Sequence, residues 1–292
     1  MRKLLGRDAY SAPSVGTRIM RGLCAINFNS LRILLRKGPS ALTSFLTNSH
    51  RVYAGYGMPK SWENLPWREN LRVPQRRIEQ IFPEVDFRIC PELVFPMSRD
   101  LGVSTEEMAV LCRVVNHLRP QRVIEFGTAE GRTTVNLALN VPTEAKVITI
   151  DLPPIAGQNE VGYFYWNHPV KSKILQVFCS ITDWDSRAFR SSAEVVFADA
   201  CDLMPGLGAE FFQAITVVKR GGVIFHHDYG SSIGATLFWN WVSERLPVAH
   251  VAGTTLVCLR LDSDEVLEQA QSLLSDPFIK ETVSTPSSEP KL

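Results

Sequence analysis

The chain has 292 residues, 45% of them hydrophobic, and its 31 Lys and Arg nearly balance its 30 Asp and Glu. This length favours one sizeable domain with an appendage and leaves too little chain for two full domains. The basic amino terminus lacks the apolar stretch of a secretory signal, and no run of about 18 uncharged apolar residues occurs. We therefore expect a soluble, cytoplasmic protein without a transmembrane segment.

The six cysteines lie far apart, with no C-x-x-C pair and no Cys/His cluster at zinc-ligand spacing. We expect reduced thiols, most of them buried. They are Cys24, Cys90, Cys112, Cys179, Cys201 and Cys258.

Charge is spread unevenly, because residues 1–60 hold ten Lys and Arg against a single acid, Asp8. Such a basic arm could contact anionic lipid, nucleic acid or an acidic partner, and a solvated or subunit-contacting extension explains it more simply. Residues 1–20 show no periodicity and are expected to be disordered. Residues 21–100 are expected to form a helical and irregular extension that acts as a lid or a homodimer contact, with short helices on either side of Gly38-Pro39.

A regular alternation of elements fills the predicted main domain, residues 101–262. Ser104 and Glu107 form a capping box ahead of apolar residues at helical spacing, which predicts a helix that Pro120 ends. Strands are predicted at 122–126, 146–150, 174–178, 194–198 and 222–225, with helices at 131–139, 209–218 and 235–245. Strands that alternate with helices predict an α/β, doubly wound, Rossmann-like parallel sheet.

The last part of the domain has a different pattern. Two short strands, 249–252 and 255–261, flank Gly253-Thr254 and predict an antiparallel hairpin, which makes a seven-stranded and mostly parallel sheet. A helix is expected within 263–275. The Ser/Thr/Pro/Glu-rich residues 276–292 are expected to be a disordered tail.

The turn after the first strand is the expected ligand site, because ligands of such sheets bind beyond the carboxyl ends of the strands. The segment Glu125–Thr134 reads EFGTAEGRTT, in which Gly127 and Gly131 let the backbone approach a ligand. The helix that follows opens with free N–H groups, which favour negative charge. A dinucleotide-binding loop would need glycine where Ala129 and Arg132 stand, and a generic strand-to-helix turn is the plain alternative.

Asp151 ends the second strand, where a carboxylate can accept hydrogen bonds from both ribose hydroxyls of an adenosine. After the third strand, Ser180 to Asp183 form a polar turn. A helix N-cap by Thr182 or Asp183 is an equally good explanation of that turn.

The E-x-G-x-x-x-G spacing resembles motif I of class I S-adenosylmethionine-dependent methyltransferases. The resemblance implies S-adenosylmethionine as cofactor, with Glu125 under its methionine moiety and Ser180 and Asp183 beside its adenine. The cofactor-contacting residues implied by this resemblance, together with Asp151, are Glu125, Gly127, Thr128, Gly131, Thr133, Asp151, Ser180, Asp183 and Asp199.

The stretch Val195–Gly230 is similar to the macrocin-type group of sugar and natural-product O-methyltransferases. The positions that match are Asp199, Gly221, Gly222, His227, Asp228 and Tyr229. The sequence departs from the group at Ala200, Cys201 and Asp202, where Gly, Asp and His are usual. The resemblance covers roughly residues 101–261.

The resemblance also implies a catalytic role for Asp199 and His227. Asp199 and Asp228, at the ends of adjacent strands, could share Mg²⁺, which prefers oxygen ligands. His227 would remove the proton of the acceptor hydroxyl, and since successive strand residues face opposite sides, only one of His226 and His227 should face the site. The alternatives are carboxylates that only line the pocket and a packed histidine.

These observations predict methylation of a hydroxyl on a small molecule or glycan, with S-adenosylmethionine and optionally a divalent metal. The acceptor would contact the aromatic stretches Tyr53–Trp67 and Tyr163–His168 and the turn after Asp228, and plain packing is the alternative for the cluster at Tyr163. The altered turn at Asp199 also allows a non-catalytic binding or scaffold protein, and the basic arm allows methylation of RNA or protein. The N/D-P-P-Y/F motif of many amino-group methyltransferases is absent after the fourth strand, which argues against base methylation.

Overall fold

A computed structural model describes residues 71–95, 102–154, 161–202 and 206–284, all within the unit Pro59–Leu292. The predictions for residues 1–70 lie outside these ranges: the basic arm, the helices beside Gly38-Pro39 and the aromatic stretch from Tyr53 to Trp67. The expected lid or homodimer contact of residues 21–100 stays a prediction.

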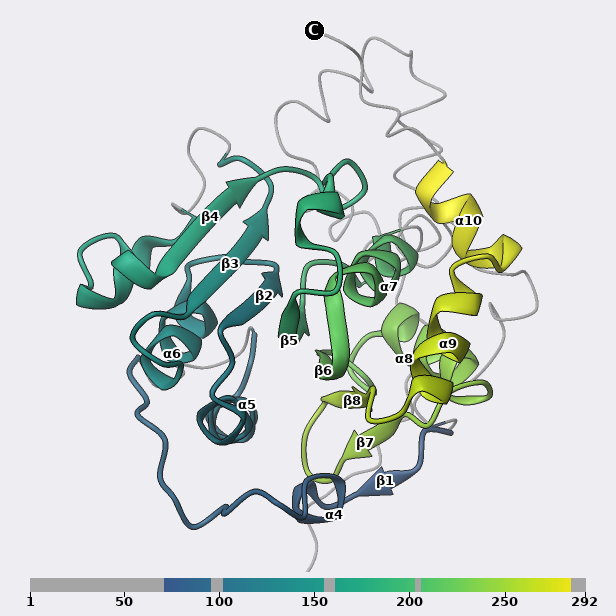
Figure 1. Cartoon of the computed structure of the whole chain (residues 1–292), viewed down its shortest axis with the longest axis horizontal. Coiled ribbons are helices and arrows are strands. Elements are labelled where there is room, and N and C mark those ends of the chain that lie inside the picture. Colours follow the sequence, from purple (N-terminus) through teal and green to yellow (C-terminus); the bar gives the residue numbers. More distant parts are fainter. Residues whose placement is uncertain (1–70, 96–101, 155–160, 203–205, 285–292) are drawn as a thin grey trace, which may run out of the picture. The chain divides into compact units, whose positions relative to one another are not determined.

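The described strands form one sheet in the order β1-β7-β8-β6-β5-β2-β3-β4 (Figure 1). Strand β8 pairs antiparallel with β6 and β7, and every other pair is parallel. The predicted doubly wound, mostly parallel Rossmann-like sheet with its antiparallel hairpin is confirmed. The strands are β1 (Gln75–Arg76), β2 (Arg122–Phe126), β3 (Lys146–Asp151), β4 (Ile174–Phe178), β5 (Ala193–Ala198), β6 (Val218–His226), β7 (Ala249–Val251) and β8 (Val257–Arg260).

The eighth strand, β1, was not predicted. It lies parallel to β7 at the sheet edge, where the N–H of His250 donates to Pro74 O at 2.9 Å and the N–H of Ala252 donates to Arg76 O at 2.9 Å. Two residues carry no periodicity that a sequence could reveal, so only the partner strand defines β1.

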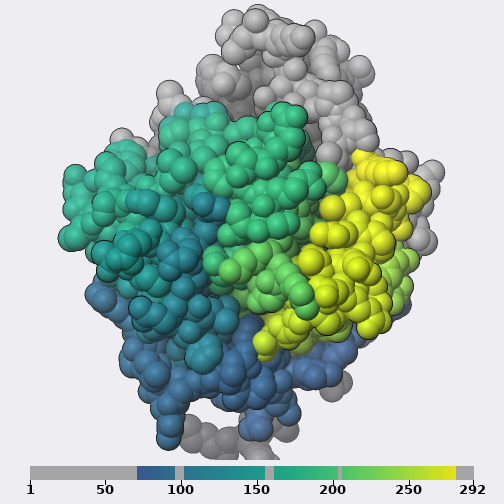
Figure 2. Space-filling model, viewed as in Figure 1, coloured from purple at the N-terminus to yellow at the C-terminus, as the bar shows by residue number. Residues whose placement is uncertain are grey.

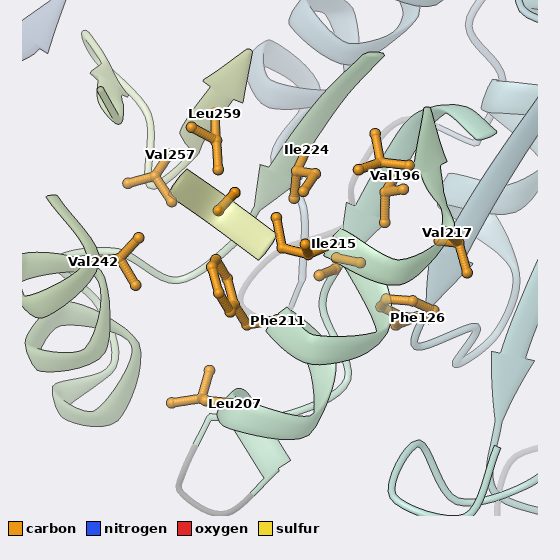
Figure 3. Packing of buried hydrophobic residues seen from close by; sticks show 14 of the residues in the cluster. Phe126, Val196, Leu207, Phe211, Ile215, Val217, Ile224, Val242, Val257 and Leu259 are labelled. Carbon is orange, nitrogen blue, oxygen red and sulfur yellow. The ribbon is translucent and has the colours of Figure 1, made fainter. Parts of the chain in front are cut away.

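Helices cover both faces of the sheet (Figure 1). Along β2, Val123 packs with α5 and α6 on one face, and Ile124 packs with α7 and α8 on the other. Figure 3 shows the second face, where Phe211 and Ile215 of α7 pack against the strands. The helices that cover the sheet are α5 (Thr105–Leu118), α6 (Arg132–Asn140), α7 (Gly206–Val217), α8 (Ile233–Ser243) and α9 (Asp264–Leu273).

The expected disordered tail was wrong for Pro277–Ser284, which form α10. Ile279 is fully buried, and the Phe278 ring lies 5.0 Å from the ring of Trp241 on α8. Together α9 and α10 form the yellow flank in Figure 2. Two apolar residues inside a polar segment are enough to anchor a short helix once a partner surface exists. The other short helices are α4 (Ile78–Ile81), η3 (Tyr163–Tyr165), η4 (Pro169–Lys173) and η5 (Ser186–Phe189).

None of the described helices is long and apolar enough to cross a membrane. The five cysteines within the described ranges are free. Cys112 and Cys258 are buried, and burial raises the pKa of both thiols. Cys179 and Cys201 are half-buried and Cys90 is exposed, so fewer of these five thiols are buried than expected.

Candidate active site

The loop between β2 and α6 has the backbone that its glycines predict. Gly127 and Gly131 have φ of 89° and 84°. A Cβ on Gly127 would lie 2.4 Å from the carbonyl oxygen of Asp199, and one on Gly131 would lie 2.7 Å from the Tyr165 ring. The sequence-based reason, room for a ligand, is therefore incomplete, because neighbouring parts of the chain already require both glycines.

Gly127→Ala should destabilise the protein by about 2 kcal/mol more than Gly221→Ala. Both glycines have positive φ, so alanine at either position carries left-handed strain of about 1–2 kcal/mol. A Cβ at Gly221 meets nothing within 4 Å, whereas at Gly127 it meets the Asp199 backbone, which adds about 1–3 kcal/mol. Urea unfolding of both variants measures the difference. Equal losses would mean that the loop shifts freely away from Asp199.

Glu125 lies fully buried at the end of β2. Its Oε2 accepts a hydrogen bond from Thr134 Oγ1 at 2.5 Å, and its Oε1 has no partner among the described residues. Burial raises the pKa of Glu125 to about 8. The predicted Thr133 is half-buried in the first turn of α6, but it is its neighbour Thr134 that contacts the acid.

Glu125→Gln should remove a pH-dependent loss of stability. The folded protein holds the Glu125 proton more tightly than the unfolded chain, so the wild type loses stability as pH rises from 4.5 to about 8. The shift corresponds to a loss on the order of 5 kcal/mol. Urea unfolding from pH 4.5 to pH 8.5 should show that the free energy of unfolding falls less in the variant than in the wild type as pH rises. Parallel curves would show that Glu125 is ionised in the folded protein.

Asp151, at the end of β3, is hydrogen-bonded to the backbone of the glycine loop. Its Oδ2 accepts hydrogen bonds from the N–H groups of Thr128 and Ala129 at 2.9 and 2.8 Å, and its Oδ1 accepts from Leu152 N at 2.6 Å. The structure thus brings together Asp151 and Thr128, two of the predicted cofactor residues. Contact with a ribose stays a prediction.

The turn after β4 contains the predicted adenine residues. The hydroxyls of Ser180 and Thr182 lie 2.8 Å apart, and Asp183 is exposed. Gln213 on α7 anchors this turn, because its Nε2 donates to the carbonyls of Ile181 at 3.3 Å and of Trp184 at 2.9 Å. The roles of Ser180 and Asp183 toward adenine stay predictions.

Asp199, His227 and Asp228 meet where β5 and β6 end. His227 Nδ1 lies 3.1 Å from Asp199 Oδ1 and 3.3 Å from Asp228 Oδ1. One ligand atom from each of the three lies within 4.8 Å of the others, which is close enough to hold one metal ion. The strand-end argument correctly predicted that Asp199 and Asp228 lie together.

Only His227 of the two adjacent histidines faces this cluster. His226 is buried on the other side, where its Nε2 lies 3.3 Å from Glu210 Oε2. Burial lowers the pKa of His226, but the Glu210 carboxylate outweighs it and the net pKa is raised. The expectation that at most one of the pair faces the site agrees with this arrangement.

Glu107 is a site residue that the sequence revealed only as a helix cap. Its Oε2 lies 3.3 Å from His227 Nε2, so His227 has carboxylates on both ring nitrogens. Burial lowers the pKa of His227, yet hydrogen bonds to Asp199, Asp228 and Glu107 raise it to about 12. Burial raises the pKa of Glu107, but hydrogen bonds from His227, Thr255 and Ser104 outweigh it and hold this pKa well below its usual range.

The turn Ala200–Asp202, which departs from the macrocin-type pattern, is fixed by hydrogen bonds to α7 and to the turn before α8. Ala200 N donates to Glu210 Oε1 at 2.8 Å, and Ser232 Oγ donates to Asp202 O at 3.1 Å. Burial and the neighbouring Asp228 raise the pKa of Asp202 to about 6. The altered turn thus places a further acid beside the cluster.

A cleft of about 760 Å³ opens beside this cluster. Its walls are the start of α5, the end of β6 with the turn that follows, and the turn before β8; they include Glu107, His227 and Thr255. The predicted aromatic contact Tyr163–His168 does not line it. Within that segment Tyr165 is buried against Gly131, while Tyr163 is 62% exposed.

No family model and no curated protein matches the sequence. Among solved structures, the chain is similar to cofactor-bound Rv0187 from MTB, at 19% identity over 56% of this chain and 84% of that one, with a TM-score of 0.46. It is similar to the O-methyltransferase from Bacillus cereus in complex with SAH, at 16% identity over 56% and 83% of the two chains, with a TM-score of 0.43. It is also similar to SAH-bound methyltransferase PaMTH1 from Podospora anserina, at 14% identity over 74% and 96%, with a TM-score of 0.45. At these identities and TM-scores the likeness says nothing about what this chain binds.

Proposed function

We propose that the protein is an S-adenosylmethionine-dependent methyltransferase that methylates a hydroxyl of a small molecule or glycan. One observation carries this proposal. The glycine loop closed by Asp151 and the cluster around His227 lie beyond the carboxyl ends of neighbouring parallel strands, where doubly wound sheets bind ligands.

The residues of the loop fit the cofactor. Glu125 offers a buried oxygen without a partner among the described residues, and this oxygen could pair with the ammonium of the methionine moiety. The first N–H groups of α6 favour its carboxylate. Asp151 keeps about one lone-pair site, on Oδ1, beyond its three backbone bonds, and this site could accept from a ribose hydroxyl.

Bound S-adenosylmethionine supplies a methyl group on a sulfonium, and transfer requires an aligned acceptor that loses a proton. His227 is the candidate base. With a pKa near 12 it holds its proton in the ligand-free protein, so it can act as a base only after positive charge enters the site and offsets its carboxylates. The sulfonium of the bound cofactor would supply such charge.

Asp199 and Asp228 would hold a divalent cation, which lowers the pKa of a bound hydroxyl. In that case His227 joins them as a ligand through Nδ1 while its Nε2–H faces Glu107, so it is not the base. The cation and the His227 base are therefore alternative ways to activate the hydroxyl. An imidazole in the set suits Mn²⁺ or Zn²⁺ better than Mg²⁺, which prefers oxygen ligands. The proposal therefore keeps a divalent metal and makes Mg²⁺ one of the ions to be tried.

Calorimetric titration with S-adenosylmethionine and its demethylated product, with and without Mg²⁺, Mn²⁺ or Zn²⁺, tests the proposal. Failure of both ligands to bind would end the methyltransferase proposal. Cofactor binding with no response to any metal, or the same metal response in Asp228→Ala, would remove only the cation. A panel of sugars, phenols and RNA with labelled cofactor then identifies the acceptor class.

A non-catalytic binding protein is the second candidate. The contacts of His227 favour it, because Asp199 occupies Nδ1 and Glu107 occupies Nε2 in the ligand-free protein. Neither ring nitrogen is then free to take a proton from an acceptor. Cofactor binding without turnover on any acceptor would support it. Methylation of RNA or protein, a homodimer through the extension, lipid or nucleic-acid contact by the basic arm and a cytoplasmic location stay predictions.

A further inference from the structure

Glu107 makes more contacts than a helix cap requires. Its Oε2 accepts from Ser104 N at 2.8 Å, which completes the capping box, and also faces His227 Nε2 at 3.3 Å. Its Oε1 accepts from the backbone N–H and the hydroxyl of Thr255, at 2.6 and 2.8 Å. The residue is 4% exposed, so its charge is compensated by these donors and not by water.

These contacts join segments that are distant in sequence. His227 and Thr255 lie 120 and 148 residues from Glu107. The three residues stand on the three walls of the 760 Å³ cleft. Capping α5 requires only the contacts with Ser104. The contacts of Glu107 with His227 and Thr255 therefore serve a different purpose.

The contact with Nε2 has a geometric consequence for His227. The two ring nitrogens are on different sides of the imidazole, so a ring whose Nε2–H donates to Glu107 directs Nδ1 to its other neighbours. Those neighbours are Asp199 and Asp228, at 3.1 and 3.3 Å. In many metal sites a carboxylate orients a ligating histidine in the same way, by accepting from the ring nitrogen that does not bind the metal.

We infer that Glu107 is the positioning residue of the cleft: it fixes the orientation of the His227 imidazole and ties the Thr255 turn to α5. The inference rests on the proposed function, because it assigns Glu107 a part in the same site. In this role Glu107 acts through His227, which it contacts at Nε2.

The test compares three variants of the full chain. Glu107→Gln has only one acceptor oxygen for the donors that now share two. Ser104→Ala removes the hydroxyl that caps α5 at Glu107 N but leaves the Glu107 carboxylate. Glu79→Gln removes an exposed acid in the first turn of α4, away from the cleft. The readouts are the ¹⁵N-edited NMR signals of the imidazoles, with His227 assigned from its loss in His227→Gln, and the steady-state constants for methyl transfer.

Glu107→Gln should shift or abolish the Nε2–H signal of His227 and lower kcat about 10- to 100-fold, with KM for the cofactor within about twofold. Ser104→Ala should lower Tm by about 3 °C and leave the His227 signal in place. Glu79→Gln should change neither the signal nor the rate. An unchanged His227 signal in Glu107→Gln would overturn the inference and reduce Glu107 to a cap. The NMR result does not need turnover, so it stands even if the cofactor fails to bind and the proposed function falls.

Discussion

Replacing Asp151 with alanine is expected to weaken binding of S-adenosylmethionine by about 100-fold or more. The carboxylate holds the N–H groups of Thr128 and Ala129, and in the proposed complex it also accepts from the ribose. Each hydrogen bond to a charged group contributes about 1.5–3 kcal/mol, and a loss of about 2.7 kcal/mol already corresponds to 100-fold. Isothermal calorimetry measures the change.

Two further variants separate the causes of this loss. Asp151→Asn keeps an acceptor oxygen for the loop but loses the charge, so its affinity should fall by about 10-fold. Asp86→Ala removes an exposed acid that is paired with Arg88, away from the loop, and should leave affinity unchanged. If Asp151→Ala binds the cofactor as the wild type does, the carboxylate does not contact it.

Replacing His227 with glutamine is expected to lower the rate of methyl transfer by about 10²- to 10⁴-fold, the usual contribution of a general base. The cofactor affinity should stay within about threefold, because the predicted cofactor contacts, on the glycine loop, at Asp151, after β4 and at Asp199, do not include His227 itself. Initial rates with labelled cofactor and the acceptor found by the panel measure the first quantity. Calorimetry measures the second.

The control is His117→Gln, which alters an exposed histidine in the last turn of α5. Its rate should equal that of the wild type. A rate in His227→Gln within a few-fold of the wild type would show that His227 does not remove the proton. The divalent cation would then be the remaining way to activate the hydroxyl.

The regular elements were predictable because their patterns are local. The bounds of β2 and β4 agree with the predicted strands, and the capping box placed the start of α5. The elements that sequence reasoning missed, β1 and α10, depend on contacts. Strand β1 exists through its bonds to β7, and α10 through the packing of Phe278 and Ile279.

In the candidate site, too, some residues could be placed from the sequence and others only from tertiary contacts. The strand-end rule was enough to bring Asp199 and Asp228 together, because adjacent parallel strands end at one edge of the sheet. That Thr134 reaches Glu125 depends on the rotation of α6 against the sheet, and the cofactor contact of Thr133 stays a prediction. Helical phase at a first turn is poorly defined by sequence.

From its sequence alone, the chain is determined to be a doubly wound α/β domain with a glycine loop, an acid at the end of the next strand and a His-Asp pair three strands further on. Only the tertiary structure decided that His227 is held between carboxylates, and that Glu107 joins the helix cap to the cleft. The physical reason is distance along the chain: propensity and spacing act over a few residues, whereas the environment of a buried charge depends on groups more than 100 residues away.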